Sequence, residues 1–171
     1  MRLGDHFQQI KKKYHNTFFS GICFDHRKIK KNYIFFAIKG NNLDGNNFIP
    51  SVIKKGCKII VTEKNFDELK NGVLFINTKN IRKLLAQISF SIFKKKPNNL
   101  IAVTGTNGKS SVSDFYYQIL NLNNKKVASI GTLRVRSNNF NLNLLNTTIE
   151  PISLRKILNE IKKRKIENVI M

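Results

Sequence analysis

The stretch that decides the fold is Val103-Thr104-Gly105-Thr106-Asn107-Gly108-Lys109-Ser110-Ser111. The apolar residues 100–103 before the loop predict a buried strand, and residues 112–120 after it predict a helix. A glycine-rich turn between a strand and a helix, ending in Gly-Lys-Ser, is typical of a phosphate-binding loop, because backbone N–H groups and the helix N-terminus face the anion. Lys109 would add a positive charge, and the Ser110 hydroxyl would be a ligand for Mg²⁺. The stretch therefore predicts a site for a nucleoside triphosphate.

The glycine spacing departs from the general phosphate-loop pattern. That pattern has a Gly five residues before Gly108, where Val103 stands here, and the first glycine of this loop is Gly105. The alternative interpretation is a Gly-Asn turn that only happens to precede a lysine. The strand, the turn, the Lys-Ser pair and the helix all come in the required order, which favours the phosphate site.

The composition is strongly basic, with 31 basic and 10 acidic residues and a net charge of +21. Such a charge is typical of proteins that bind nucleic acid or membrane surfaces. Here, however, 24 of the basic residues are Lys and only 7 are Arg, and 23 residues are Asn, which indicates a compositional bias. The basic runs at 11–13, 28–31, 94–96 and 162–165 are dispersed, with no Arg-rich stripe. We therefore expect no nucleic-acid partner, only a general attraction for anionic nucleotides.

Two further features concern the cellular setting. Cys23 and Cys57 are the only cysteines, and no Cys-x-x-Cys pair is present, which favours a reducing compartment. The longest apolar runs, such as 33–38, are far shorter than the roughly 20 residues that cross a bilayer. The N-terminus also lacks the apolar region of a signal peptide. We expect a cytoplasmic protein without membrane insertion, and a monomer.

Alternating strands and helices predict an α/β fold with parallel sheets in both halves. We expect strands at 18–24, 33–38, 57–62, 73–76, 100–103, 126–130 and 167–171, and helices at 46–55, 80–93, 112–120 and from Pro151 onward. Residues 137–146 are expected to form a hairpin or a loop. Pro97 ends the second helix, so we expect a domain boundary there, with domains at 1–96 and 97–171. The last strand opens a new β–α unit, so we expect the second domain to be truncated.

The sequence Thr-Gly-Thr-Asn-Gly-Lys-Ser at 104–110 resembles the ATP loop of the Mur ligases and of their relative folylpolyglutamate synthase. The folate enzyme usually has an extra Gly directly after the Lys, whereas Ser110 and Ser111 follow directly here, as in the Mur branch. The folate enzyme also lacks a separate uridine-nucleotide domain. The α/β sequence of residues 1–96 therefore favours the Mur ligases.

The resemblance extends along most of the chain. Phe24-Asp25-His26-Arg27, the run Ile34-Phe35-Phe36-Ala37-Ile38-Lys39-Gly40 and the pair Asp44-Gly45 resemble the N-terminal domain of the family branch that adds the third peptide residue. Asn146-Thr147-Thr148 resembles a Thr-Thr element that follows the ATP loop in the same branch. This implies a Rossmann-like uridine-nucleotide domain followed by the start of a P-loop Mur-ligase central ATPase domain.

The function that the resemblance implies is ATP-dependent ligation in peptidoglycan synthesis. ATP, with Mg²⁺, would phosphorylate a carboxylate of UDP-N-acetylmuramoyl-L-alanyl-D-glutamate, and the amine of diaminopimelate or lysine would attack the acyl phosphate. The sequence leaves the choice between these two amino acids open. The chain alone is expected to be inactive. The alternatives are a ligase similar to folylpolyglutamate synthase and a basic P-loop NTPase that acts on nucleic acid.

The resemblance also assigns site residues. Lys109 would be the catalytic residue and Ser110 the metal ligand, and Asp25 and Arg27 would organise a turn. The loop residues implied to bind ATP are Gly105, Thr106, Asn107, Gly108, Lys109, Ser110 and Ser111; those implied to bind the UDP end of the substrate are Phe24, His26, Asn41 and Asn42; those implied to bind the muramoyl-peptide end are Asn146, Thr147 and Thr148. His26 departs from the family, which usually has Ser there, and Ile149 stands where Pro often follows.

Overall fold

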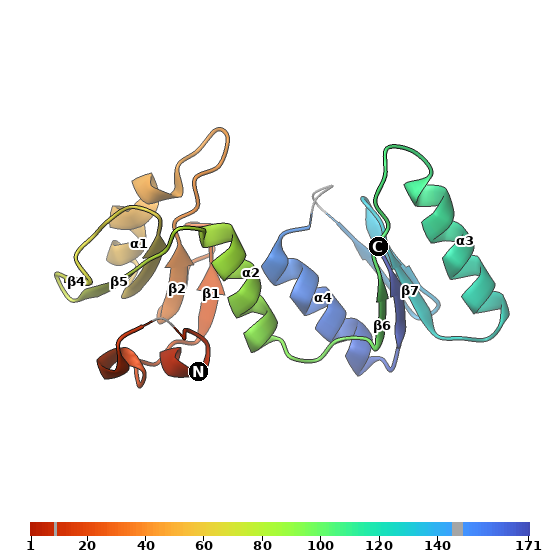
Figure 1. The fold of residues 1–171 in the computed structure, drawn as a ribbon, viewed down its shortest axis with the longest axis horizontal. Helices are drawn as coiled ribbons and strands as arrows, with labels where there is room; N and C mark the ends of the chain where they lie inside the picture. The colour runs from red at the N-terminus through yellow and green to blue at the C-terminus, as the bar shows by residue number, and fades with distance from the viewer. Residues whose placement is uncertain (9, 145–148) are drawn as a thin grey trace. The chain divides into compact units, whose positions relative to one another are not determined.

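The structure is a computed structural model that describes residues 1–8, 10–144 and 149–171. The chain forms two compact units, Met1–Ile92 (unit 1) and Phe93–Met171 (unit 2), each with its own sheet (Figure 1). Among the described residues, the helices are all too short or too polar to cross a membrane.

Unit 1 is built on a five-stranded sheet in the order β1-β2-β3-β5-β4. Its strands are β1 (Gly21–Cys23), β2 (Tyr33–Phe36), β3 (Ile59–Thr62), β4 (Leu69–Lys70) and β5 (Val73–Asn77). Four strands are parallel, as predicted, but β4 pairs antiparallel with β5. The two residues between them, Asn71 and Gly72, both have positive φ (51° and 74°), the geometry of a tight hairpin turn. The parallel sheet that the sequence predicts is therefore present, with an antiparallel edge strand that was not among the predicted elements.

The helical elements of unit 1 lie around this sheet. They are η1 (Leu3–Asp5), η2 (Lys12–Tyr14), η3 (Gly45–Phe48), α1 (Ile49–Lys54) and α2 (Ile81–Ile92). The helix predicted at 46–55 begins as a 3₁₀ turn, η3. The Asp44 carboxylate caps this turn by accepting a hydrogen bond from the Asn46 N–H at 2.8 Å. The helix ends before Gly56, whose φ of +85° favours glycine.

Both faces of the unit 1 sheet are buried. On one face, Phe35 packs in a cluster with Val52 of α1 and with Ile60 and Phe75 of the neighbouring strands. Ile34 and Phe36 point to the opposite face and are also fully buried. Helix α2 buries Ile81, Leu85 and Ile88, and it lies on the other side of the sheet from α1 (Figure 1). Burial of both faces explains why these strands are continuous apolar runs in the sequence.

Unit 2 has a sheet in the order β6-β10-β7-β8-β9. Its strands are β6 (Asn99–Ile101), β7 (Val127–Ile130), β8 (Arg134–Ser137), β9 (Phe140–Asn143) and β10 (Asn168–Ile170). Strand β10 runs parallel to both neighbours, while β8 and β9 form an antiparallel hairpin. This hairpin begins at Arg134, before the range 137–146 for which a hairpin or a loop is expected. The sheet is therefore mixed and not purely parallel.

Helices α3 (Lys109–Leu122) and α4 (Pro151–Lys163) lie on opposite faces of this sheet (Figure 1). Helix α4 buries Ile157, Leu158 and Ile161 in a cluster with residues of β7 and β10. As predicted, Pro151 lies in its first turn. The Glu150 carboxylate caps the helix by accepting hydrogen bonds from the N–H groups of Ile152 (2.7 Å) and Ser153 (2.8 Å).

The strand predicted at 100–103 forms as β6 (Asn99–Ile101), but the prediction that it is buried is wrong. Leu100 and Ile101 in β6 are 37% and 39% exposed. The reason is the sheet order: β10 inserts between β6 and β7, so that β6 has a neighbour on one side only in the described part of the chain. The apolar character of the run shows that it is a strand, but its place in the sheet depends on a segment far away in the sequence.

Candidate functional site

The predicted phosphate loop connects the end of β6 to the start of α3. The Val103 N–H donates to the carbonyl of Met171 at 2.7 Å, which holds the start of the loop against β10. Gly105 and Gly108 have φ of +150° and +77°, and Gly108 is the N-cap of α3. A residue with a side chain would be strained in these conformations. The loop thus places the free N–H groups of the first turn of a fourteen-residue helix at the end of the sheet, as an anion site requires.

Lys109 is the first residue of α3 and folds back over the loop. Its ammonium donates to the carbonyl of Thr106 at 3.1 Å and also to the carbonyl of Gly105. Lys109, Ser110 and Ser111 are all exposed. The positive charge therefore lies at the mouth of the loop, next to the helix N-terminus, where a phosphate would be attracted by both.

Three side chains that are not among the predicted site residues join α3 to the sheet. The Arg136 guanidinium of β8 forms an ion pair with the Asp114 carboxylate and lies 4.0 Å from the centroid of the Tyr117 ring. The hydrogen bond from Arg136 lowers the pKa of Asp114. No local sequence pattern predicts this pairing, because Asp114 and Arg136 belong to different elements. These contacts fix the helix whose N-terminus forms the candidate phosphate site.

In unit 1, the loop that follows β1 carries Phe24 and His26. The Arg27 backbone N–H and Nε both donate to Oδ1 of Asp25 (3.0 and 2.9 Å), and Arg27 Nη2 donates to Oδ2 at 2.9 Å. These bonds lower the pKa of Asp25 to about 2. The Asp25–Arg27 ion pair stabilises this turn through bonds within the loop. Phe24, which comes directly before the pair, is 37% exposed.

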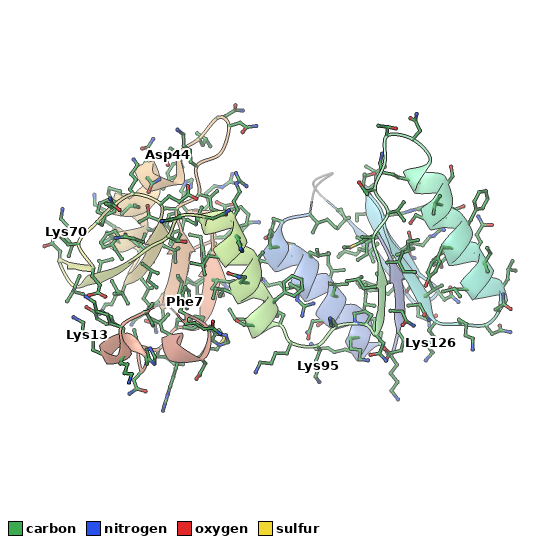
Figure 2. The ribbon with its side chains drawn as sticks, in the orientation of Figure 1. Phe7, Lys13, Asp44, Lys70, Lys95 and Lys126 are labelled. Atoms are coloured by element: carbon green, nitrogen blue, oxygen red, sulfur yellow. The ribbon has the colours of Figure 1, made fainter. Side chains whose placement is uncertain are left out.

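The loop that follows β2 is a second small turn. The Gly40 N–H donates to the Leu43 carbonyl (2.8 Å), and the Gly45 N–H donates to the Ile38 carbonyl (2.9 Å). A Cβ at Gly45 would lie only 2.6 Å from that same carbonyl oxygen, so glycine is required there. Asp44, at the end of this loop, is labelled at the upper edge of unit 1 in Figure 2. The loop presents Asn41 and Asn42 as exposed side chains.

The two loops lie at the same edge of the sheet, because β1 and β2 are parallel neighbours and each loop follows the carboxyl end of its strand. The structure therefore places four of the predicted site residues at the carboxyl end of the parallel strands: Phe24, His26, Asn41 and Asn42. Asn146, Thr147 and Thr148 lie outside the described residues.

Comparison with known sequences identifies both halves of the chain. Residues 19–91 match the sequence model of the Mur ligase family catalytic domain, and residues 103–171 match that of the Mur ligase middle domain. The UDP-N-acetylmuramoyl-L-alanyl-D-glutamate–2,6-diaminopimelate ligase of Rickettsia conorii is 37% identical over 161 residues, which cover 91% of this chain and 33% of the relative. The enzyme of the same name from Fusobacterium nucleatum is 37% identical over 155 residues, covering 90% and 31%.

Solved structures show the same fold. A structure of a UDP-N-acetylmuramoyl-L-alanyl-D-glutamate–2,6-diaminopimelate ligase superposes with a TM-score of 0.79 at 19% identity, over 99% of this chain and 36% of that one. MurF of Thermotoga maritima, solved in complex with ADP, gives a TM-score of 0.54 at 20% identity, over 87% of this chain and 30% of that one. The chain spans about a third of the length of the relatives that it matches. With two models of one family matching successive segments and relatives of that family 37% identical over nine tenths of its length, the chain belongs to the Mur ligase family.

Proposed function

We propose that the chain carries the uridine-nucleotide and ATP-binding parts of a ligase that adds diaminopimelate to UDP-N-acetylmuramoyl-L-alanyl-D-glutamate in peptidoglycan synthesis. The observation that supports the proposal is the phosphate loop at the start of α3. The chain that contains this loop is 37% identical to a relative that is named for this activity. In this proposal residues 1–96 bind the UDP-linked substrate and residues 97–171 bind ATP.

The contacts of Lys109 support a role in binding phosphate. Its ammonium lies on the carbonyls of Gly105 and Thr106, at the mouth of the loop. A bound triphosphate would take over this charge and would accept hydrogen bonds from the free N–H groups of the first turn of α3. The reaction of a phosphoryl group with a carboxylate depends mainly on position and on charge neutralisation, and both are what this loop offers. Lys109 would thus stabilise the charge on the transferred phosphoryl group.

A magnesium ion fits the donors that are present. Among the described residues, His, Cys, Asp and Glu form no group of three that could hold a metal ion by itself. The exposed Ser110 hydroxyl follows Lys109 in the loop, and one hydroxyl together with nucleotide phosphates and water is a coordination that Mg²⁺ accepts. When bound, the ion would neutralise charge on the phosphates.

The UDP end of the substrate would lie at the carboxyl edge of the unit 1 sheet, on Phe24, His26, Asn41 and Asn42. Asn146, Thr147 and Thr148 would contact the muramoyl-peptide end, an assignment supported by the sequence resemblance alone. We also propose that the protein is a cytoplasmic monomer. Cys23 and Cys57 are both buried as thiols and are not joined in a disulfide, which supports a reducing compartment.

Binding of ATP by the 171-residue chain tests the proposal. The substitution Lys109→Ala should weaken the binding of magnesium ATP by at least about tenfold, since a charged contact to phosphate contributes about 1.5–3 kcal/mol. Lys125→Ala is the matched control, because Lys125 is an exposed lysine beyond the opposite end of α3, and it should bind as the wild type does. Titration calorimetry measures both affinities, and circular dichroism checks that the variants are folded. Equal affinity for ATP in Lys109→Ala and the wild type would contradict the assignment.

A further inference from the structure

The His26 ring is held in one orientation by a second ring. The imidazole of His26 lies face to face with the Phe48 ring, with centroids 3.8 Å apart and an angle of 7° between the planes. Phe48 is itself anchored, since it ends η3 and packs against the core cluster of unit 1. The Lys55 ammonium fixes the backbone on the same side by donating to the His26 carbonyl at 3.0 Å. Both the side chain and the backbone of His26 are thus restrained.

One face of the imidazole is covered by this stack, and the residue as a whole is only partly buried. Within the described residues, neither ring nitrogen of His26 has a hydrogen-bond partner, and Phe48 is its only ring neighbour. His26 is half-buried and lies in the loop after β1, at the same sheet edge as Asn41 and Asn42. A flat, restrained and partly exposed aromatic ring at a binding edge is the arrangement on which nucleobases stack.

We propose that the outer face of the His26 imidazole, backed by Phe48, is a stacking platform for the uracil base of the UDP-linked substrate. This inference rests on the proposed function of unit 1. A stack on His26 would differ in kind from the hydrogen bond that a serine can offer at this position. The ring would fix the plane of the base, and the amides of Asn41 and Asn42 would be left for its polar edge or for the ribose and diphosphate.

Two substitutions separate stacking from hydrogen bonding. His26→Phe keeps a flat ring but has no ring nitrogen, and His26→Asn keeps a donor and an acceptor but has no ring. If the base stacks, His26→Phe should bind UDP within about twofold of the wild type, while His26→Asn should bind it about fivefold to 150-fold more weakly, the range given by base–aromatic stacking. Lys30→Ala, at an exposed position later in the same loop, is the control and should leave the affinity unchanged.

Proton NMR of UDP titrated with the full 171-residue chain gives a second readout, which a purely structural role of His26 would not move. Stacking on an aromatic ring shifts the uracil H5 and H6 resonances upfield, and this shift should persist in His26→Phe and vanish in His26→Asn. Wild-type affinity and an unchanged shift in His26→Asn would overturn the inference, and so would a His26→Phe variant that binds as weakly as His26→Asn. A wild-type chain that does not bind UDP at all would instead contradict the proposed function, and the inference with it.

Discussion

The sheet of unit 1 is covered on both faces, whereas unit 2 leaves apolar surface open. In β2, Ile34, Phe35 and Phe36 are consecutive residues with 0% exposure. In unit 2, all three residues of β6 are exposed, and so is one side of α3. That side carries four apolar residues at helical spacing, with exposures between 52% and 80%: Val112, Phe115, Ile119 and Leu122.

The difference shows that apolar residues at helical spacing mark a surface that can be buried. Whether that surface is buried depends on whether another element packs against it. Helix α3 buries only Tyr117 among its fourteen residues, while α4 buries five of thirteen. Both helices cover the same sheet, so that the sheet alone does not account for the apolar side of α3. An apolar stripe of this kind marks an interaction surface or a site of aggregation.

The largest expected effect compares a buried ring of unit 1 with an exposed ring of unit 2. Phe35→Ala should lower the free energy of unfolding of unit 1 by about 3–5 kcal/mol, because it opens a cavity in a fully buried cluster. Phe115→Ala removes a ring that is 62% exposed and should change the stability of unit 2 by less than about 0.5 kcal/mol. Hydrogen exchange resolved by peptide measures the opening of each unit separately. A loss of similar size in both variants would contradict the comparison.

The next effect compares two glycines that are required for different reasons. A Cβ at Gly45 would meet the backbone O and N of Ile38 at 2.6 and 2.7 Å, so Gly45→Ala should destabilise unit 1 by up to about 3 kcal/mol. A Cβ at Gly108 would meet nothing within 4 Å, and only its φ of +77° opposes the change. Gly108→Ala should therefore cost unit 2 about 1–2 kcal/mol. Thermal unfolding followed by NMR signals of each unit gives both values, and a larger loss for Gly108→Ala would refute this ranking.

The smallest effect is a difference in acid sensitivity. The hydrogen bond from Arg27 lowers the pKa of Asp25 to about 2, below its value in the unfolded chain. The ionised carboxylate therefore stabilises unit 1 above pH about 4, and this stabilisation is lost as the pH falls from about 4 to about 2. We expect about 1 kcal/mol, because Arg27 is largely exposed. In unit 2 the pKa of Asp114 is also lowered, but this carboxylate is 42% exposed, so the dependence should be weaker.

Urea unfolding between pH 2 and 5, again read from signals of each unit, tests this difference. Asp25→Asn should remove the pH dependence that Asp25 gives to unit 1, while Asp114→Asn should alter that of unit 2 only slightly. An unchanged pH profile for unit 1 in Asp25→Asn would show that the ion pair with Arg27 has no effect on stability.

Much of the fold follows from local sequence. The succession of strand, loop and helix at 100–122 is predictable because the apolar run, the glycines and the helical period are all contained in it. The β4–β5 hairpin was missed, although Asn71-Gly72 is a strong signal for the tight turn that its positive φ angles produce. The exposure of β6 was not predictable in the same way, since it depends on where β10 inserts.

The candidate site likewise contains features that adjacent residues predict and features that depend on contacts between distant residues. The glycine-rich loop and its place before α3 were predicted from adjacent residues. The stack of His26 on Phe48 and the ion pair of Asp114 with Arg136 join separate elements, and neither had a signal in the sequence. The roles of the loop residues in binding ATP and those of Asn146, Thr147 and Thr148 stay predictions.

The position of β10 also sets an order of events during synthesis. The strands that pair in unit 1 lie close to one another along the chain, so its sheet can assemble as the chain leaves the ribosome. Strand β6 has to wait, because its partner β10 is made much later: the Asn99 amide reaches Asn168 across 69 residues. Closing so long a loop is entropically costly and slow. Until residues 168–170 are translated, unit 1 is complete, but β6 and the phosphate loop that follows it lack the strand that joins them to the rest of the unit 2 sheet.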